Sequence, residues 1–444
     1  MKFLTKNFKG ENLRARVLRS SSITFVGYGL EQVLRLASNL ILTRILFPEA
    51  FGIMALATTI LVGLTMLSDL GIQHSLIQNK KGSENYFRDT AWVAQIFKGF
   101  LLWLFACLIS YPIAIIYEAP VLFPLICALG STLAIKGFNS TSIAISNKDL
   151  KIFKLSAVKL GTQSISIILT VIFAYYLNSI WALVWGNIIS SIISVLAGHI
   201  LLNNNYKHRF KVDMTSLRQI ISFGKWIMIS SMFGFLANQA DKMIIGKMLS
   251  LTDLGIFTIA ITLAQVPKAL LQSLDRMVLF PVYSKMQDQN DDERTKKVFR
   301  SKILICSMLL PIAIVLLIWG DILVEFLYDS RYKDAGWMLQ ILAAGIAIEI
   351  VTNVGPYYLG LGKSNIFALL MGVKAFLLIV CMLIGGLMLG PPGLIMGISI
   401  SSALYYLVEI KFMRKYKIWF WKFDSVLIFL IAFICFITYS NKFN

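Results

Sequence analysis

Long apolar runs follow one another along nearly the whole chain of 444 residues, separated by short polar or charged stretches. Each run has about the twenty residues that a helix needs to cross a bilayer. The pattern predicts an all-α, polytopic membrane protein with twelve spanning helices and a thirteenth near the end. We expect the helices at 22–43, 49–70, 90–116, 119–141, 154–177, 180–202, 221–246, 253–276, 300–320, 336–360, 364–389, 393–411 and 423–440.

The composition agrees with that pattern and excludes a soluble domain. The chain is 57% hydrophobic and 15% charged, with a mean hydropathy of +0.73, whereas soluble domains are nearer a quarter charged. Residues 1–20 are basic and contain no apolar core of a signal peptide, so we expect them to be a cytoplasmic segment.

The formal net charge of +19 reflects membrane topology rather than nucleic-acid binding. Lysines and arginines gather in every second connection, for example at Lys80, Lys81 and Arg88, and are rare in the connections between. Such an asymmetry places the basic side in the cytoplasm, where anionic membrane lipids attract it. We therefore predict a bacterial inner-membrane protein with a cytoplasmic N-terminus, and a thirteenth span would leave the C-terminus outside.

The cysteines and histidines do not predict a metal or cofactor site. The five cysteines fall in apolar runs, and neither they nor the three histidines have metal-ligand spacing. The chain also lacks a phosphate-binding loop, so ATP hydrolysis is not expected. We predict a protein that is not an enzyme and has no cofactor.

An internal repeat appears when the sequence is shifted by 203 residues. Residues 30–57 then align without a gap with residues 233–260, and Gly52 and Ala57 match Gly255 and Ala260. The first span of each half is equivalent and six helices apart, so both halves enter the membrane in the same direction, as in many transporters. We predict two bundles of six helices around a central cavity.

The repeat sets the predicted domain organisation. It consists of five segments: a cytoplasmic segment 1–20, an N-lobe 21–203, a linker 204–220, a C-lobe 221–413, and residues 414–444 with the thirteenth helix and tail. The linker length would permit the two lobes to move.

Polar side chains at helical spacing predict which helices line the cavity. They lie on the first helix (Glu31, Arg35, Asn39), the seventh (Asn238, Asp241, Lys242) and the eighth (Gln265, Lys268, Gln272, Asp275, Arg276). Charges at mid-membrane cost free energy unless they are used or paired. The favoured interpretation is a shared aqueous cavity. The alternative is that Glu31 and Arg35, spaced i and i+4, form a self-neutralising pair.

Other intramembrane charges have two interpretations. Lys136, Lys159 and Lys225 lie near cytoplasmic helix ends, where a lysine can extend its ammonium group to the interface. Lys374 is too deep for that and is able to pair with Glu349 in the neighbouring helix.

Four segments carry a family resemblance: LTRILFPEAFGIMALA with SDLGIQHSLIQ (42–57 and 68–78), the stretch 223–260 with FPVYSKMQ, NKDLKIFKLSAVK (147–159), and YDSRYKDAGWMLQIL (328–342). Together they resemble the oligosaccharide flippases of the multidrug/oligosaccharidyl-lipid/polysaccharide exporter superfamily, in the lipopolysaccharide and colanic-acid exporter branch. The resemblance covers about residues 20–410.

That resemblance implies a function. The family moves polyprenyl-pyrophosphate-linked oligosaccharides from the cytoplasmic to the outer leaflet by alternating access, with basic cavity residues meeting the pyrophosphate. The carboxylates Glu31, Asp241 and Asp275 suggest coupling to H⁺ or Na⁺. The basic connections 203–219 and 285–302 are candidate docking sites for a polysaccharide polymerase or other glycan-assembly proteins, although solvated, lipid-attracted connections are the favoured explanation.

Two other functions stay open. A small-molecule or drug antiporter of the same fold would carry cationic cargo, but the deep polar positions here lean basic. A membrane glycan polymerase or ligase would need a sizeable outer loop, and the longest outer connection, 319–337, is short. Its aromatic residues Trp319, Tyr328, Tyr332 and Trp337 are typical of a belt at the membrane surface.

Overall fold

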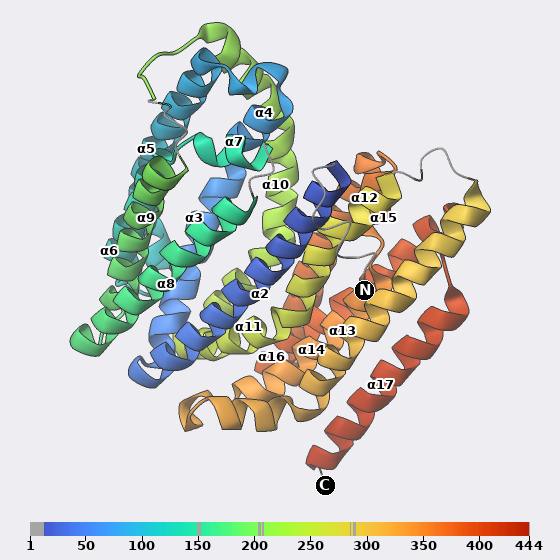
Figure 1. Cartoon of the computed structure of the whole chain (residues 1–444). Helices are drawn as coiled ribbons and strands as arrows, with labels where there is room; N and C mark the ends of the chain where they lie inside the picture. The colour runs from blue at the N-terminus through green and yellow to red at the C-terminus, as the bar shows by residue number, and fades with distance from the viewer. Residues whose placement is uncertain are drawn as a thin grey trace. The chain divides into compact units, whose positions relative to one another are not determined.

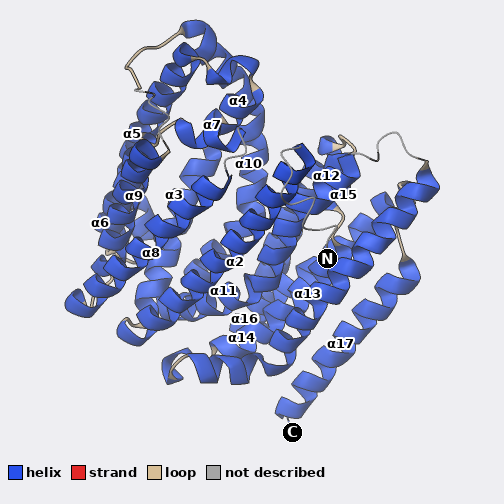
Figure 2. Ribbon diagram, viewed as in Figure 1, coloured by secondary structure: helices blue, strands red, loops and turns tan. Residues whose placement is uncertain are grey.

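The computed structural model describes residues 13–148, 152–202, 206, 208–284, 286 and 290–443. Within these ranges the chain is built from helices and contains no strand (Figure 2). The predicted all-α class is therefore confirmed. Two compact units make up the chain. Unit 1 contains residues 1–46 and 56–232, and unit 2 contains residues 47–55 and 233–444.

Unit 1 holds the first six long predicted helices and two short ones (Figure 1). They are α2 (Leu13–Ile45), most of α3 (Pro48–Leu67), α4 (Ile72–Gln78), α5 (Asn85–Ile116), α6 (Leu122–Gly137), α7 (Ser142–Lys148), α8 (Ile152–Leu177), α9 (Trp181–Leu201) and the first part of α10 (Met214–Met248). The short α4 and α7 were not predicted, because neither is long enough to show a clear apolar period.

Unit 2 contains the end of α10 and the helices that follow. They are α11 (Leu251–Leu274), the π-helical turn η2 (Asp275–Leu279), α12 (Phe280–Ser284), α13 (Asp291–Leu327), α14 (Ala335–Thr352), α15 (Gly355–Gly360), α16 (Ser364–Lys415) and α17 (Trp421–Phe443). The first turns of α3 also pack in this unit.

The helices have the length and apolarity of membrane spans. In the described ranges nine helices are long and apolar enough to cross a membrane. The number is ten if α6 and α7, which are bent by 61° at their junction, form one span. The chain is thus a multi-pass membrane protein. The helices α2 and α10 are absent from that group of described spans, and they carry the polar positions predicted above.

Equivalent glycines of the repeat pack against each other inside unit 2. A Cβ on Gly52 would lie 1.8 Å from the Leu251 carbonyl oxygen, and a Cβ on Gly255 would lie 1.9 Å from the Pro48 carbonyl oxygen. The two contacts interchange under the shift of 203 residues. Helices α3 and α11 therefore cross backbone to backbone, which only glycine allows.

The 52-residue α16 is bent rather than straight. Gly390 has φ 64° and ψ −144°, and Pro391 and Pro392 follow it. The glycines on either side of the bend, Gly385 and Gly393, have their backbones in contact. Because Gly390 adopts a conformation that other residues rarely reach, α16 makes two spans, as predicted for 364–389 and 393–411.

The thirteenth predicted helix, α17, is an integral part of unit 2. It lies beside α13 (Figure 1). Asp424 at its first turn is buried and pairs with Lys302 of α13 at 2.6 Å. Tyr406 of α16 donates to the same carboxylate at 3.2 Å. A buried ion pair fixes the start of α17 on the bundle.

Three sequence predictions need correction. The helix α2 begins at Leu13 and α13 at Asp291, so polar stretches that were assigned to the segment 1–20 and the connection 285–302 extend the helices. Residues 1–12, 203–205, 285 and 287–289 lie outside the described residues. Tyr328 and Tyr332 are 5% and 0% exposed, so they pack inside the protein and not in a lipid-facing belt.

The predicted linker is not a free tether where it is described. Tyr206 Oη donates to Asp89 Oδ1 at 2.6 Å, and the Arg209 backbone N–H donates to the same oxygen at 2.9 Å. The Asp213 backbone N–H donates to Thr90 Oγ1 at 2.8 Å. The start of α5 therefore holds this connection against unit 1.

Candidate functional site

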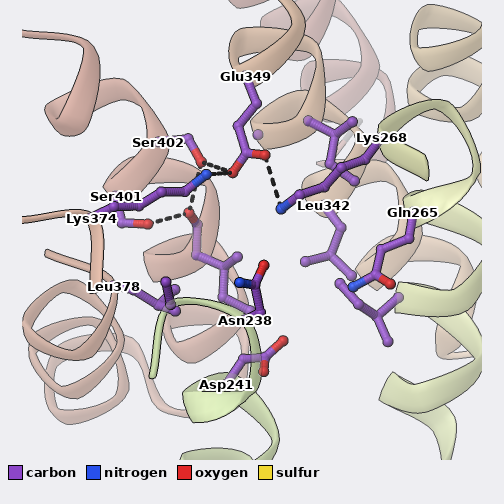
Figure 3. Close-up of a pocket in the computed structure, with 15 residues that line it drawn as sticks. Asn238, Asp241, Gln265, Lys268, Leu342, Glu349, Lys374, Leu378, Ser401 and Ser402 are labelled. Carbon is purple, nitrogen blue, oxygen red and sulfur yellow. Dashed lines mark hydrogen bonds and ion pairs between the residues drawn. The ribbon is translucent and has the colours of Figure 1, made fainter. Parts of the chain in front are cut away.

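Three charged side chains from three helices of unit 2 meet in one place (Figure 3). Lys268 comes from α11, Glu349 from α14 and Lys374 from α16. The Lys268 Nζ lies 2.9 Å from Glu349 Oε2, and the Lys374 Nζ lies 2.8 Å from Glu349 Oε1. Each carboxylate oxygen therefore holds one ammonium group, and this charged triad carries one net positive charge.

Small residues bring α14 and α16 close enough for the triad to form. A Cβ on Gly345 would lie 2.7 Å from Ser399 Oγ, so a larger residue would push the helices apart. Ser399 Oγ donates to the Ile341 carbonyl at 2.6 Å. Ser402 Oγ, one turn further along α16, donates to Glu349 Oε1 at 3.4 Å. These contacts orient the carboxylate toward both lysines.

The triad is largely withdrawn from solvent. The Lys268, Glu349 and Lys374 side chains are 22%, 15% and 21% exposed. Desolvating three charges costs several kcal/mol per ion, and the attraction between them offsets that cost only in good geometry. Ionisable groups at this depth usually serve a substrate or ion path in transporters.

Two pockets meet at the triad. One leaves about 50 Å³ for the centres of water-sized molecules, which accommodates a few waters. The other leaves about 330 Å³ and accommodates a larger polar group. Asn238, Lys268, Glu349 and Lys374 line both pockets. A ligand in the larger pocket would therefore reach the triad directly.

The wall of the larger pocket contains a local irregularity. The α-helical pattern of α11 changes to a π-helical turn at Asp275, and such turns are frequent at functional sites. Asn353 Nδ2 donates to Asp275 Oδ1 at 2.7 Å, and Gln272 and Arg276 line the pocket beside it. The turn thus presents one carboxylate and one guanidinium to the same space.

A second buried carboxyl borders this pocket. Glu409 is 2% exposed, and Tyr405 Oη donates to its Oε1 at 3.2 Å. Its Oε2 is buried and has no hydrogen-bond partner in the described part of the chain. Lys374 and Lys302 are the cations close enough to attract it.

Most of the residues predicted from the second half of the chain come together here. Those that line one or both pockets are Asn238, Asp241, Gln265, Lys268, Gln272, Asp275 and Arg276. Lys242 is adjacent: its backbone N–H donates to Asp241 Oδ1 at 2.8 Å, and its Nζ donates to Gln239 Oε1 at 3.0 Å.

The residues predicted from the first half lie on α2 in unit 1. Glu31 Oε2 accepts from Lys159 Nζ of α8 at 2.7 Å, so the alternative of a Glu31–Arg35 pair is wrong. Arg35 is exposed and Asn39 is partly buried. That these α2 residues share a cavity with the seventh and eighth helices stays a prediction.

The sequence pattern predicts only part of this site. The depth of Lys374 and Glu349 predicts that the two can pair, and the structure shows this pair joined by Lys268. Ser402, Asn353 and Glu409 carried no signal, because single polar residues in apolar helices do not reveal which neighbour they face. The depth of Glu349 and Lys374 was the one available signal.

The family relationship follows from comparison with known proteins. The family described as polysaccharide biosynthesis protein matches residues 41–336, about two thirds of the chain. The chain belongs to this family. The predicted resemblance to polysaccharide exporters is thereby confirmed.

This chain is similar to lipopolysaccharide biosynthesis protein WzxC of Escherichia coli K12. The two are 23% identical over 397 residues, which cover 88% of this chain and 79% of the relative.

Solved structures agree on the fold. The lipid II flippase MurJ in an inward closed conformation matches this family member with a TM-score of 0.67 and 15% identity, covering 96% of this chain and 99% of that one. A multidrug resistance MATE transporter of the MOP superfamily matches with a TM-score of 0.65 and 14% identity, covering 95% and 96% of the two chains.

Proposed function

We propose that the protein is a flippase that moves a polyprenyl-pyrophosphate-linked oligosaccharide, the repeat unit of a surface polysaccharide, across a bacterial inner membrane by alternating access. Family membership and the MurJ-like fold support this function. The observation that carries it is the charged triad, because two ammonium groups share one carboxylate inside a membrane-spanning bundle.

The triad suits an anionic head group better than a cationic drug. A pyrophosphate that enters the larger pocket can accept hydrogen bonds from Lys268 and Lys374, replacing Glu349 as their partner. Attraction between such charges is much stronger in a low-dielectric site than in water. Arg276 at the pocket wall adds a third cation. A drug antiporter is the second candidate. It is favoured only by the similarity of the fold to that of a multidrug resistance MATE transporter.

Transport against a gradient requires an energy source, and in this proposal the carboxylates are acceptors for a coupling ion. Asp241, Asp275 and Glu349 line the pockets, so uptake of H⁺ or Na⁺ by one of them would change how strongly the lysines are held. In this proposal, the cation competes with Lys268 and Lys374 for the Glu349 carboxylate, and the ammonium groups that it displaces bind the substrate. Arg35 and Glu31 of α2 serve the N-lobe side of the path. The protein itself catalyses no covalent step.

The proposed orientation places the basic connections and the N-terminus in the cytoplasm. Membrane lipids are its direct surroundings, and a polysaccharide polymerase or another glycan-assembly protein would take up the product on the outer side.

The deciding experiment measures in which leaflet the complete lipid-linked repeat unit lies. In a deletion strain we expect it on the cytoplasmic leaflet, as read with a membrane-impermeant lectin on inverted and right-side-out vesicles. Wild type should restore outer-leaflet exposure, whereas Lys268→Ala should reduce it at least tenfold at equal protein level. Lys154→Gln removes one exposed charge outside these pockets and serves as control. A normal leaflet distribution in the deletion strain would instead favour the drug antiporter.

A further inference from the structure

A separate pocket lies within unit 1, lined by residues of α5 and of the ends of α3 and α6. It leaves about 380 Å³ for the centres of water-sized molecules, which is similar to the larger pocket at the charged triad. Its wall includes Lys98 of α5, Lys136 at the end of α6, and Asp69 just after α3. Two cations and one anion thus face the same space.

The lysines of this pocket are not neutralised as those of the triad are. Neither Lys98 nor Lys136 lies within 4.0 Å of a carboxylate oxygen in the described ranges, although Asp69 is close enough to attract Lys98 at longer range. Asp69 Oδ1 is engaged by the Gly71 backbone N–H at 2.9 Å. Lys98 is partly buried and Lys136 is exposed. A partly buried ammonium such as that of Lys98 is costly without a close counter-ion, which points to a ligand that supplies the missing negative charge.

The usual structural role of a lysine at a helix end is already filled by another residue. Lysines often bind the last carbonyl groups of a helix. Here Gln95 Nε2 reaches the carbonyl oxygens of Lys136, Gly137 and Asn139 at 3.2, 3.0 and 3.3 Å. The end of α6 is therefore capped without either ammonium group, and both stay available to a ligand.

The pocket wall is tightly built. A Cβ on Gly99 would lie 2.6 Å from the Leu133 carbonyl oxygen, and a Cβ on Gly137 would lie 3.1 Å from the Gln95 carbonyl oxygen. The backbones of α5 and α6 touch at this level, so Lys98 and Lys136 project from two helices locked together.

We propose that this pocket binds the phosphate or pyrophosphate ester of a lipid from the cytoplasmic leaflet, with Lys98 and Lys136 donating hydrogen bonds to its oxygens. The expectation that the pocket opens toward the cytoplasm rests on the proposed function and its orientation. In a flippase, the pocket is a loading site distinct from the charged triad of unit 2. The chemistry fits the carrier lipid and an anionic phospholipid alike.

The test measures binding to the purified full-length protein in a neutral detergent. Farnesyl pyrophosphate, phosphatidylglycerol and inorganic pyrophosphate are the three probes. We expect the double variant Lys98→Gln/Lys136→Gln to lose at least tenfold in affinity for the tightest probe. The double Lys→Arg variant should retain binding, because it keeps both charges, and Lys154→Gln should bind like wild type. Preference for farnesyl pyrophosphate assigns the carrier lipid, and preference for phosphatidylglycerol assigns a membrane lipid.

Equal affinity of wild type and the double Gln variant for all three probes would overturn the site. If inorganic pyrophosphate binds and neither lipid probe does, the proposal that the pocket binds a lipid would be overturned. If the double Gln variant melts far below wild type, the single variants Lys98→Gln and Lys136→Gln are tested instead. Each is expected to lose at least threefold in affinity for the tightest probe. The leaflet experiment with Lys268→Ala does not depend on this pocket. The binding test can therefore overturn the loading site while the flippase function stands, and the leaflet experiment can overturn the flippase function while the pocket still binds a lipid.

Discussion

At the scale of single residues, the buried charges of the triad and of Asp424 are stable only because each one is paired. Glu349 lies between two ammonium groups, and Asp424 is matched to Lys302. Removing one member of such a cluster leaves the others desolvated and unpaired, which costs far more than the cluster contributes. The sequence shows that Glu349 and Lys374 lie deep in apolar helices. That Lys268 also pairs with Glu349 depends on how three helices pack.

Replacing Glu349 with Gln should therefore destabilise the protein by about 3–5 kcal/mol, because Lys268 and Lys374 would face each other without a counter-charge. Thermal unfolding in detergent measures this loss. Glu325→Gln, at an exposed position of α13, should leave the melting temperature nearly unchanged. Equal melting temperatures for Glu349→Gln and wild type would mean that the triad is not the charge cluster described here.

At the scale of elements, the helices were predictable and their ends were not. Apolar runs of about twenty residues predict the spans. The charged start of α13 has the composition of a loop, so the sequence alone does not predict that the helix begins at Asp291. The length of the connection after α9 predicted a linker that permits the two lobes to move. Its attachment through Asp89 and Thr90 depends on contacts more than a hundred residues apart in sequence. No local pattern encodes them.

This connection contains a histidine that should make stability depend on pH. The Thr141 backbone N–H donates to His208 Nε2 at 3.2 Å, which requires that nitrogen to be unprotonated. Burial, with His199 and Arg88 nearby, lowers the pKa of His208 from 6.5 to about 4. The unfolded chain then binds a proton that the folded chain excludes, so stability is complete above pH 6.5 and is lost as the pH falls toward 4.

The measurement is the melting temperature of wild type and His208→Gln between pH 7.5 and pH 4.5. We expect wild type to lose more stability than the variant over this interval, because glutamine does not titrate. Parallel curves for the two proteins would show that protonation of His208 does not oppose folding.

At the scale of the whole molecule, the repeat predicted from sequence is visible as a contact. Gly52 packs on Leu251, and Gly255 packs on Pro48, with each contact the repeat equivalent of the other. Sequence identity marked these glycines as equivalent but gave no sign that they touch. Polar positions that correspond in the two halves carry different residues, since Arg35 aligns with Asn238 under the shift of 203 residues. The scaffold therefore kept its symmetry while the chemistry diverged.

Gly52→Ala should destabilise the protein by about 1–3 kcal/mol or more, since its Cβ would overlap a backbone carbonyl that has no room to move. Gly161→Ala in α8 is the matched control, because a Cβ there meets nothing within 4 Å. The two variants are compared by melting temperature and by yield of folded protein in detergent. A Gly52→Ala protein as stable as the control would mean that α3 and α11 do not cross as closely as described.

The reciprocal glycine contact also bears on how this chain originated. If the two halves arose by duplication of one gene, the ancestor carried a single glycine and a single partner carbonyl at this crossing. Two copies of that ancestor would meet there by the same pair of contacts, since an interface with twofold symmetry uses one patch twice. The contact that now joins segments of one polypeptide would then be the relic of a self-complementary dimer, preserved after fusion because neither glycine can be replaced without parting the other's helix.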